Sequence, residues 1–309
     1  MIKPPKLRSG ATIGVVCPSY SINKDIYKKT SQIYIEHGFK LIEGKSLQSK
    51  DNLFAGTPQQ RADDIMDLFQ NPEVDAIVCA RGGYGANRVL PLLDYDIIKK
   101  NPKIFIGYSD ITALITSIAQ NSGFITFHGP MFVTYKDGLI DYNFNYFIDT
   151  LSGKEPIKIL PPIDFKPKVL KNGKANGPLW GGNLCLLVNR LGTSGQLDTD
   201  NKILFIEDIG EQHYRFDRMM YHMKESGVFD NINGLIIGEL LDMEDTDPSF
   251  GKSADEIIMD ICGDLNIPII TNFPCGHGKY QATLPISVPV ELDTTLDEPT
   301  LTITESPVS

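Results

Sequence analysis

The chain has 309 residues, of which 41% are hydrophobic and 22% are charged, and this composition excludes a disordered or fibrous protein. Its length predicts one large α/β unit or two domains of roughly 150 residues each. The formal net charge of -10 argues against nucleic-acid and anionic-membrane partners, because both favour a dense basic surface. A small or neutral substrate is therefore favoured.

The cysteines and the N-terminus indicate the compartment. Cysteines occur singly, without the paired spacing of a disulfide framework or a zinc knuckle, at Cys17, Cys79, Cys185, Cys262 and Cys275. Reduced thiols in the cytoplasm are the natural expectation. The basic N-terminus leads to no long apolar segment, and no stretch approaches the roughly 20 residues that span a membrane. We therefore expect neither a signal peptide nor a membrane anchor.

The first half of the chain alternates predicted strands with predicted helices. The strands lie at residues 11–17, 39–42, 74–80 and 103–107. One helix is expected over residues 24–37, and a second begins after Thr57 with a capping box and ends at Asn71-Pro72. A third, amphipathic helix should follow Ser109. This alternation predicts a parallel sheet, in a Rossmann-like domain over residues 1–150 whose ligand sites lie beyond the carboxyl ends of the strands.

The second half begins after a stretch without sustained periodicity. Residues 151–176 are rich in proline and lysine and are predicted to be the connection between domains. Residues 177–309 form the predicted C-terminal α/β domain, with helices at 182–191, 216–225 and 253–262 and strands at 202–206, 234–238 and 268–272. The tail over residues 286–304 alternates apolar and polar residues and should be β-structure.

Ser109 stands at the junction between the apolar strand that ends at Gly107 and the helix that follows. A sharp strand-to-helix turn lifts a side chain clear of the sheet, and the free N–H groups of the first helical turn can stabilise an oxyanion. Ser and Asp are also the commonest N-cap residues, so Ser109 or Asp110 alone is more often a cap than a catalyst. A base, an orienting carboxylate and a second oxyanion donor would favour catalysis.

A glycine-rich loop, Arg81-Gly82-Gly83-Tyr84-Gly85, directly follows another predicted strand. Glycines there let the backbone approach a ligand and offer it N–H groups, as in a cradle for an oxyanion or a carboxylate. The spacing fits neither the dinucleotide-binding pattern nor the P-loop, and an ordinary loop is an equally good interpretation of this motif alone.

Among the five histidines, context favours His277 as a general base. It lies in a tight loop, Pro274-Cys-Gly-His-Gly278, just after a predicted strand. A metal pair formed by Cys275 and His277 is the alternative, although two ligands without further partners make a weak zinc site. His128 also follows a strand and is a candidate for the wall of a pocket.

Glu207 is the candidate carboxylate that orients the histidine. The strand Leu204-Phe-Ile-Glu207-Asp208 ends in two acids, and Glu207 lies nearer to the apolar run, where an unpaired charge is costly to bury. Its position therefore predicts a partner. Asp208 is equally well interpreted as a helix or loop cap.

These motifs, in this order, closely resemble the LD-carboxypeptidases, a serine peptidase family that includes murein tetrapeptide carboxypeptidases and microcin C immunity peptidases. The resemblance runs almost end to end. It rests on Cys17-Pro18-Ser19, Arg81-Gly-Gly-Tyr-Gly85, Gly107-Tyr-Ser-Asp110, Trp180-Gly-Gly-Asn-Leu184, Glu207-Asp208 and Gly276-His-Gly278. Several short motifs in the right order are far more specific than any one of them.

The resemblance implies a triad of Ser109, His277 and Glu207, with an oxyanion hole made by the backbone N–H groups of Gly83 and Asp110. It also implies a serine carboxypeptidase that removes the terminal D-alanine from a murein tetrapeptide during cell-wall recycling. The bond that is cut joins this residue to the L-centre of a diamino acid such as diaminopimelate or lysine. We expect no cofactor, no metal and a homodimer.

The same resemblance leaves the substrate contacts and the substrate itself open. Candidate binding residues are Arg81, Tyr84, His128, Trp180 and Asn183, with Arg88 as an alternative partner for the terminal carboxylate. An immunity-type peptidase that cleaves an aminoacyl or peptidyl nucleotide is one alternative function. A non-catalytic protein that binds a small ligand on a two-domain scaffold is another.

Overall fold

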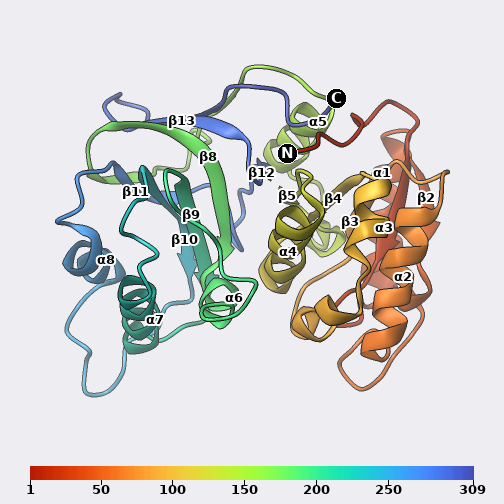
Figure 1. Ribbon diagram of the computed structural model, residues 1–309, viewed down its shortest axis with the longest axis horizontal. Helices are drawn as coiled ribbons and strands as arrows, with labels where there is room; N and C mark the ends of the chain where they lie inside the picture. Colours follow the sequence, from red (N-terminus) through yellow and green to blue (C-terminus); the bar gives the residue numbers. More distant parts are fainter. The chain divides into compact units, whose positions relative to one another are not determined.

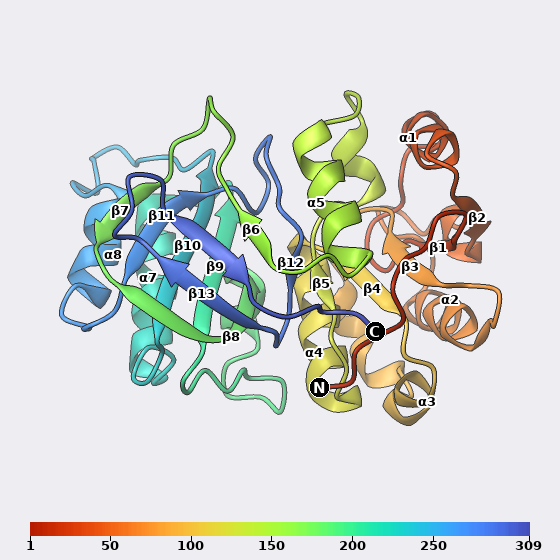
Figure 2. The same ribbon diagram turned by 90° about the horizontal axis from the view of Figure 1, so that it is seen from above.

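The computed structural model describes residues 1–309, and the chain forms two compact units; Figures 1 and 2 label their helices and most of their strands. Unit 1 contains residues 1–154, 282–287 and 306–309, and unit 2 contains residues 155–281 and 288–305. The chain therefore leaves unit 1 after residue 154 and returns to it twice. No helix in the structure is both long and apolar enough to cross a membrane.

Unit 1 is built on a six-stranded sheet in the order β12-β5-β4-β3-β1-β2. Its strands are β1 (Thr12–Val16), β2 (Lys40–Glu43), β3 (Ala76–Cys79), β4 (Ile104–Gly107), β5 (Phe127–His128) and β12 (Leu284–Pro285). The first five strands are parallel, which confirms the predicted parallel α/β unit, and β12 pairs antiparallel with β5. The strand order reverses between β1 and β3, the position where open α/β sheets bind ligands beyond the carboxyl ends of the strands.

The helices of unit 1 are α1 (Lys24–Glu36), α2 (Pro58–Gln70), α3 (Tyr95–Lys100), α4 (Thr112–Ser122) and α5 (Asp141–Leu151), with short 3₁₀ turns η1 (Lys45–Leu47), η2 (Ala86–Arg88), η3 (Leu90–Leu92), η4 (Ser109–Ile111) and η5 (Phe132–Tyr135). The capping box predicted for α2 is confirmed. The amphipathic pattern expected for α4 is wrong, because every residue from Thr112 to Ala119 is buried. Small hydroxyls make this burial possible by bonding within the helix, as Thr116 Oγ1 does to the Thr112 carbonyl at 2.7 Å.

Unit 2 contains an eight-stranded mixed sheet in the order β6-β14-β13-β8-β9-β10-β11-β7. Its strands are β6 (Ile157–Ile159), β7 (Lys168–Lys171), β8 (Lys174–Asn183), β9 (Ile203–Ile209), β10 (Gly234–Leu241), β11 (Ile269–Phe273), β13 (Pro289–Asp293) and β14 (Thr300–Ile303). Strands β8 to β11 are parallel, and the others pair antiparallel. The predicted C-terminal α/β unit with a β-rich tail is confirmed.

Three helices pack on one face of the parallel part of this sheet. They are α6 (Leu184–Asn189), α7 (His213–Glu225) and α8 (Ala254–Cys262). Apolar side chains from these helices and from β9, β10 and β11 form one core, which includes Leu204, Phe216, Ile237 and Ile257.

The stretch over residues 151–176, which the sequence predicts to be the connection between domains, carries β6 and β7, which pair with β14 and β11. Both strands are short and their partners lie far away in the sequence, so no local periodicity marks them. The helix expected from residue 182 begins at Leu184, because β8 continues through Asn183, and α7 begins at His213, three residues earlier than expected.

Candidate functional site

Ser109 lies in unit 1, directly beyond the carboxyl end of β4, with a backbone φ of +62°. This left-handed conformation is uncommon for a residue other than glycine and is typical of a strained turn that presents a side chain. Ser109 is not an N-cap. The cap of the short turn η4 is Tyr108, and the cap of α4 is Ile111, neither through a side chain. The capping alternative for Ser109 is therefore wrong.

The glycine-rich loop after β3 passes close to the Ser109 hydroxyl. A Cβ atom at Gly82 would lie 3.1 Å from Ser109 Oγ and 3.3 Å from the Asp110 nitrogen, so only glycine leaves this space open. Gly83 has a φ of +117°, and a Cβ there would overlap the ring of Tyr20. Unit 1 thus brings the predicted nucleophile, the Gly82-Gly83 backbone and the Asp110 N–H together around one small space.

The Asp110 side chain does not cap its helix, which corrects that part of the prediction. Its Oδ2 accepts hydrogen bonds from Ser19 Oγ at 2.5 Å and from the Ala86 N–H at 2.8 Å. Burial raises the pKa of Asp110, although these hydrogen bonds and the charge of Arg61 oppose the shift. The buried carboxyl of Asp110 therefore links the residue that follows Ser109 to the loop after β1 and to the loop after β3.

Arg61 supports the same two loops. Its guanidinium is buried and donates to the carbonyls of Pro18 at 2.5 Å and Gly85 at 3.1 Å. No sequence motif pointed to Arg61, and Ser19 was noted only as part of the Cys17-Pro18-Ser19 motif. A signal for Arg61 exists, because it occupies the face of α2 that also carries Ile65 and Leu68, and a cation on an apolar face indicates a buried acceptor.

Ser19→Ala is expected to lower kcat about tenfold or more, with little change in KM. The variant removes one donor from the Asp110 carboxyl, and a charge-assisted hydrogen bond of this kind contributes about 1.5–3 kcal/mol. The backbone N–H groups of Gly83 and Asp110, which the resemblance predicts to form an oxyanion hole, would then be less well positioned. Steady-state kinetics measures the effect, and Ser9→Ala, at an exposed position, is the control. A change confined to KM would contradict this positioning role.

Glu207 and His277, both in unit 2, form a direct pair. His277 Nδ1 lies 2.7 Å from Glu207 Oε2, and Glu207 is fully buried within β9. The predicted partner of the buried glutamate is therefore this histidine. Since Nδ1 faces the carboxylate, Nε2 is the nitrogen that remains for proton transfer.

The surroundings of the pair set its electrostatics. Burial lowers the pKa of His277, but the charge of Glu207 and its hydrogen bond outweigh burial and leave the pKa above its ordinary value. Two glycines make room for the carboxylate, because a Cβ at Gly238 or Gly276 would lie 2.9 or 2.8 Å from Glu207 Cβ. The pair is thus a histidine hydrogen-bonded to a fully buried carboxylate, an arrangement that can act as a general base.

The loop that carries His277 is held by its own backbone and by Gln281. Gln281 Nε2 donates to the Gly276 carbonyl, and the Cys275 N–H donates to the Phe273 carbonyl at 2.7 Å. The Cys275 thiol is fully buried, and burial raises its pKa well above the ordinary value. Nowhere in residues 1–309 do three or more His, Cys, Asp or Glu side chains gather in a way that fits a metal ion.

Asp208 and Asn183 anchor the start of α6. Asp208 accepts from the Cys185 N–H at 3.0 Å and from Asn183 Nδ2 at 3.0 Å, which confirms its interpretation as a cap. Asn183 Oδ1 accepts from the Leu186 N–H. Burial and the neighbouring charge of Glu207 raise the pKa of Asp208 to about 6. These contacts engage the Asn183 amide, a candidate for substrate binding, within the protein.

The other candidate binding residues are distributed over both units. In unit 1, Arg81 donates to the Ser21 carbonyl at 3.3 Å and lies over the ring of Tyr20, while Tyr84 is 52% exposed. His128 is fully buried there, with its ring beside that of Tyr108. In unit 2, Trp180 is almost completely buried in β8. Of these residues, Tyr84 is the most accessible to a ligand.

Comparison with known proteins gives a consistent result for both halves of the chain. Residues 13–129 match the LD-carboxypeptidase N-terminal domain, and residues 176–292 match the LD-carboxypeptidase C-terminal domain. The chain is 34% identical to the probable murein peptide carboxypeptidase of Bacillus subtilis, in an alignment that covers 94% of this chain and 92% of that relative.

Solved structures agree with this result. The structure of MccF in complex with glutamyl sulfamoyl guanosine matches with a TM-score of 0.92 and 28% identity over 100% of both chains. The muramoyltetrapeptide carboxypeptidase of Oxalobacter formigenes matches with a TM-score of 0.86 and 26% identity, over 96% of this chain and 100% of that one. The chain therefore belongs to the LD-carboxypeptidase family of serine peptidases and is an enzyme of the carboxypeptidase type.

Proposed function

We propose that this enzyme removes the terminal D-alanine from murein tetrapeptides, cutting the amide bond between that residue and the L-centre of a diamino acid. The Glu207–His277 pair carries this proposal, because a histidine backed by a buried carboxylate is the general base of serine peptidases. The relatives named as murein peptide and muramoyltetrapeptide carboxypeptidases support the substrate class.

In the proposed mechanism, His277 Nε2 accepts the Ser109 hydroxyl proton while Ser109 Oγ attacks the amide carbonyl. The backbone N–H groups of Gly83 and Asp110 stabilise the tetrahedral oxyanion. The protonated histidine then gives its proton to the leaving amine of D-alanine, and an acyl-enzyme remains. His277 next activates a water molecule, which releases the tripeptide and restores Ser109. Glu207 stabilises the imidazolium form in both halves of the reaction.

Purified protein is expected to release D-alanine from a murein tetrapeptide, which mass spectrometry of the products measures. The proposed chemistry uses no metal, so a chelator should leave the rate unchanged. Activity that a chelator abolishes and zinc restores would contradict the triad. If the protein does not cleave the tetrapeptide but does cleave a nucleotide-linked peptide, the immunity-type reaction suggested by the likeness to MccF replaces the proposed one.

We also propose a cellular location for the reaction and an oligomeric state for the enzyme. Trimming a tetrapeptide to a tripeptide suits cell-wall recycling in the cytoplasm, and the family resemblance favours a homodimer. Light scattering coupled to size-exclusion chromatography measures the assembly directly, since one chain has a mass of 34.3 kDa. A monomer at assay concentrations would contradict the dimer without affecting the assigned reaction.

A further inference from the structure

Strand β10 contains an extra residue directly opposite Glu207. Ile237 pairs with Ile206, and Leu240 pairs with Asp208, so both Gly238 and Glu239 stand opposite the single residue Glu207. Bulges of this kind re-aim a side chain and are common beside active sites. Here the re-aimed side chain is Glu239, whose backbone N–H donates to the Cys275 carbonyl in the loop that carries His277.

The Glu239 carboxylate lies against that loop, one residue beyond the histidine. A Cβ at Gly278 would overlap the Glu239 carboxylate, so glycine at position 278 is what allows the two segments to approach. Glu239 Oε1 is buried and has no hydrogen-bond partner. Burial raises the pKa of Glu239 to about 7, and no donor or cation counteracts this shift.

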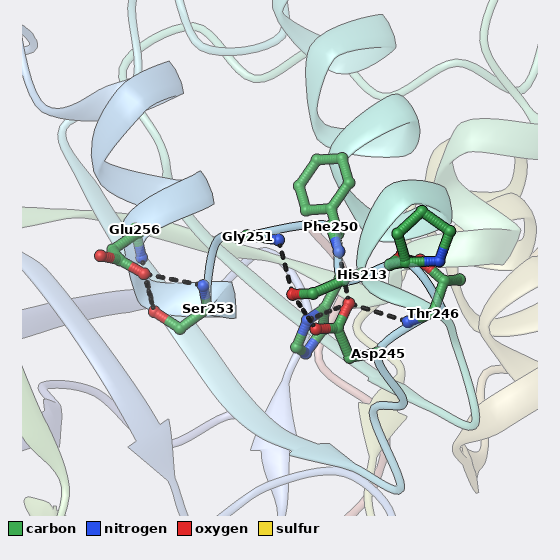
Figure 3. A network of polar contacts seen from close by, with 9 residues as sticks. His213, Asp245, Thr246, Phe250, Gly251, Ser253 and Glu256 are labelled. Carbon is green, nitrogen blue, oxygen red and sulfur yellow. Dashed lines mark hydrogen bonds and ion pairs between the residues drawn. The ribbon is translucent and has the colours of Figure 1, made fainter.

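Two acids that follow on the same connection, Asp245 and Glu256, do have hydrogen-bond partners. Figure 3 shows Asp245, in the loop after β10, with hydrogen bonds from the Thr246 and Phe250 N–H groups at 2.8 Å each and an ion pair with His213 at 3.8 Å. Hydrogen bonds from Ser249 and these N–H groups lower the pKa of Asp245 to about 2. Glu256 accepts from the Ser253 N–H and hydroxyl at 2.8 Å each. The protein thus satisfies these two acids and leaves Glu239 without a partner.

We propose that Glu239 is a subsite for a cation of the substrate, and that it pairs with the free ammonium group on the side chain of the diamino residue. This inference rests on the proposed function, because that function places a diamino acid on the acyl side of the bond that is cut. A half-buried carboxylate without a partner gains most from a ligand that brings its own positive charge. A carboxylate or phosphate ligand would meet repulsion at the same place.

A charge-dependent binding experiment tests the subsite. Two tetrapeptides are compared that differ only at the side chain of the third residue, which carries either a free lysine amine or its N-acetylated form. Binding is measured calorimetrically to Ser109→Ala, so that turnover does not interfere, and to the same protein with Glu239→Gln. Acetylation and Glu239→Gln are each expected to weaken binding by about 10- to 100-fold, the loss expected for one charge-assisted hydrogen bond.

The decisive result is the combination of the two changes. If Glu239 binds the ammonium, Glu239→Gln has no further effect on the acetylated peptide, because the partner is already absent. An equal loss for both peptides would indicate a purely structural role and overturn the proposal. Unchanged affinity of the Glu239→Gln protein for the free-amine peptide would also overturn the proposal, because it would mean that Glu239 acts as a protonated carboxyl donor, which glutamine can replace. An absence of measurable binding by either peptide would overturn it too.

The controls separate this proposal from the assigned reaction and from folding. Glu244→Gln, at an exposed position in the loop after β10, should change neither affinity. Glu239→Gln should not lower the melting temperature at pH 7, because it removes a half-buried charge without a partner. Cleavage of either tetrapeptide by the unmodified enzyme tests the proposed function independently. An active enzyme with charge-independent binding would overturn the subsite alone.

Discussion

Ser109→Ala is expected to lower kcat/KM on a murein tetrapeptide by on the order of 10⁴- to 10⁶-fold, as loss of the nucleophile does in other serine peptidases. The substitution removes only the hydroxyl. Alanine keeps a Cβ and therefore tolerates the φ of +62° about as well as serine does, so the strand-to-helix turn should persist. Product release measured by mass spectrometry gives the rate, and circular dichroism gives the fold.

Two comparisons make this result specific to the hydroxyl. Ser9→Ala, at an exposed position, should retain full activity. Ser109→Ala should still bind the tetrapeptide, because binding does not require the nucleophile. Undiminished turnover by Ser109→Ala in a correctly folded protein would refute the serine mechanism and with it the assigned triad.

Glu207→Gln is expected to reduce kcat by about 10³- to 10⁴-fold and to change the pH dependence of what remains. The base must be neutral, so activity is lost as the pH falls through the pKa of His277. In the unmodified enzyme this pKa lies above the ordinary value of 6.5, because the charge and hydrogen bond of Glu207 outweigh burial. Removing the charge of Glu207 leaves burial as the larger influence on the pKa of His277. The acid limb of the pH profile, where activity falls, should therefore move to lower pH.

Profiles of kcat/KM against pH for the two proteins measure this shift, since kcat/KM reports the free enzyme. Glu225→Gln, an exposed position at the end of α7, should leave both the rate and the acid limb unchanged. An acid limb that stays in place in Glu207→Gln would mean that another group titrates, and His277 would lose its role as the base.

The sequence predicted those candidate site residues that a local sequence pattern marks. Glu207 was found because an apolar run ends in a carboxylate that needs a partner, and His277 because a glycine-flanked loop follows a strand. The Ser19–Asp110 contact was not predictable in this way, because the two residues are 91 positions apart and only the order β4-β3-β1 in the sheet brings the segments after β1 and β4 together. The bulge opposite Glu207 likewise depends on pairing between strands, which no local period encodes.

The return of residues 282–287 to unit 1 has a consequence for how the protein is made. Without β12, strand β5 would be the open edge of the parallel sheet, with exposed N–H and C=O groups that favour pairing with other chains. During translation this edge stays uncovered until 130 further residues have left the ribosome (from residue 154 to residue 284). A fragment cut at residue 154 is therefore expected to aggregate, and nascent chains would need protection during that interval.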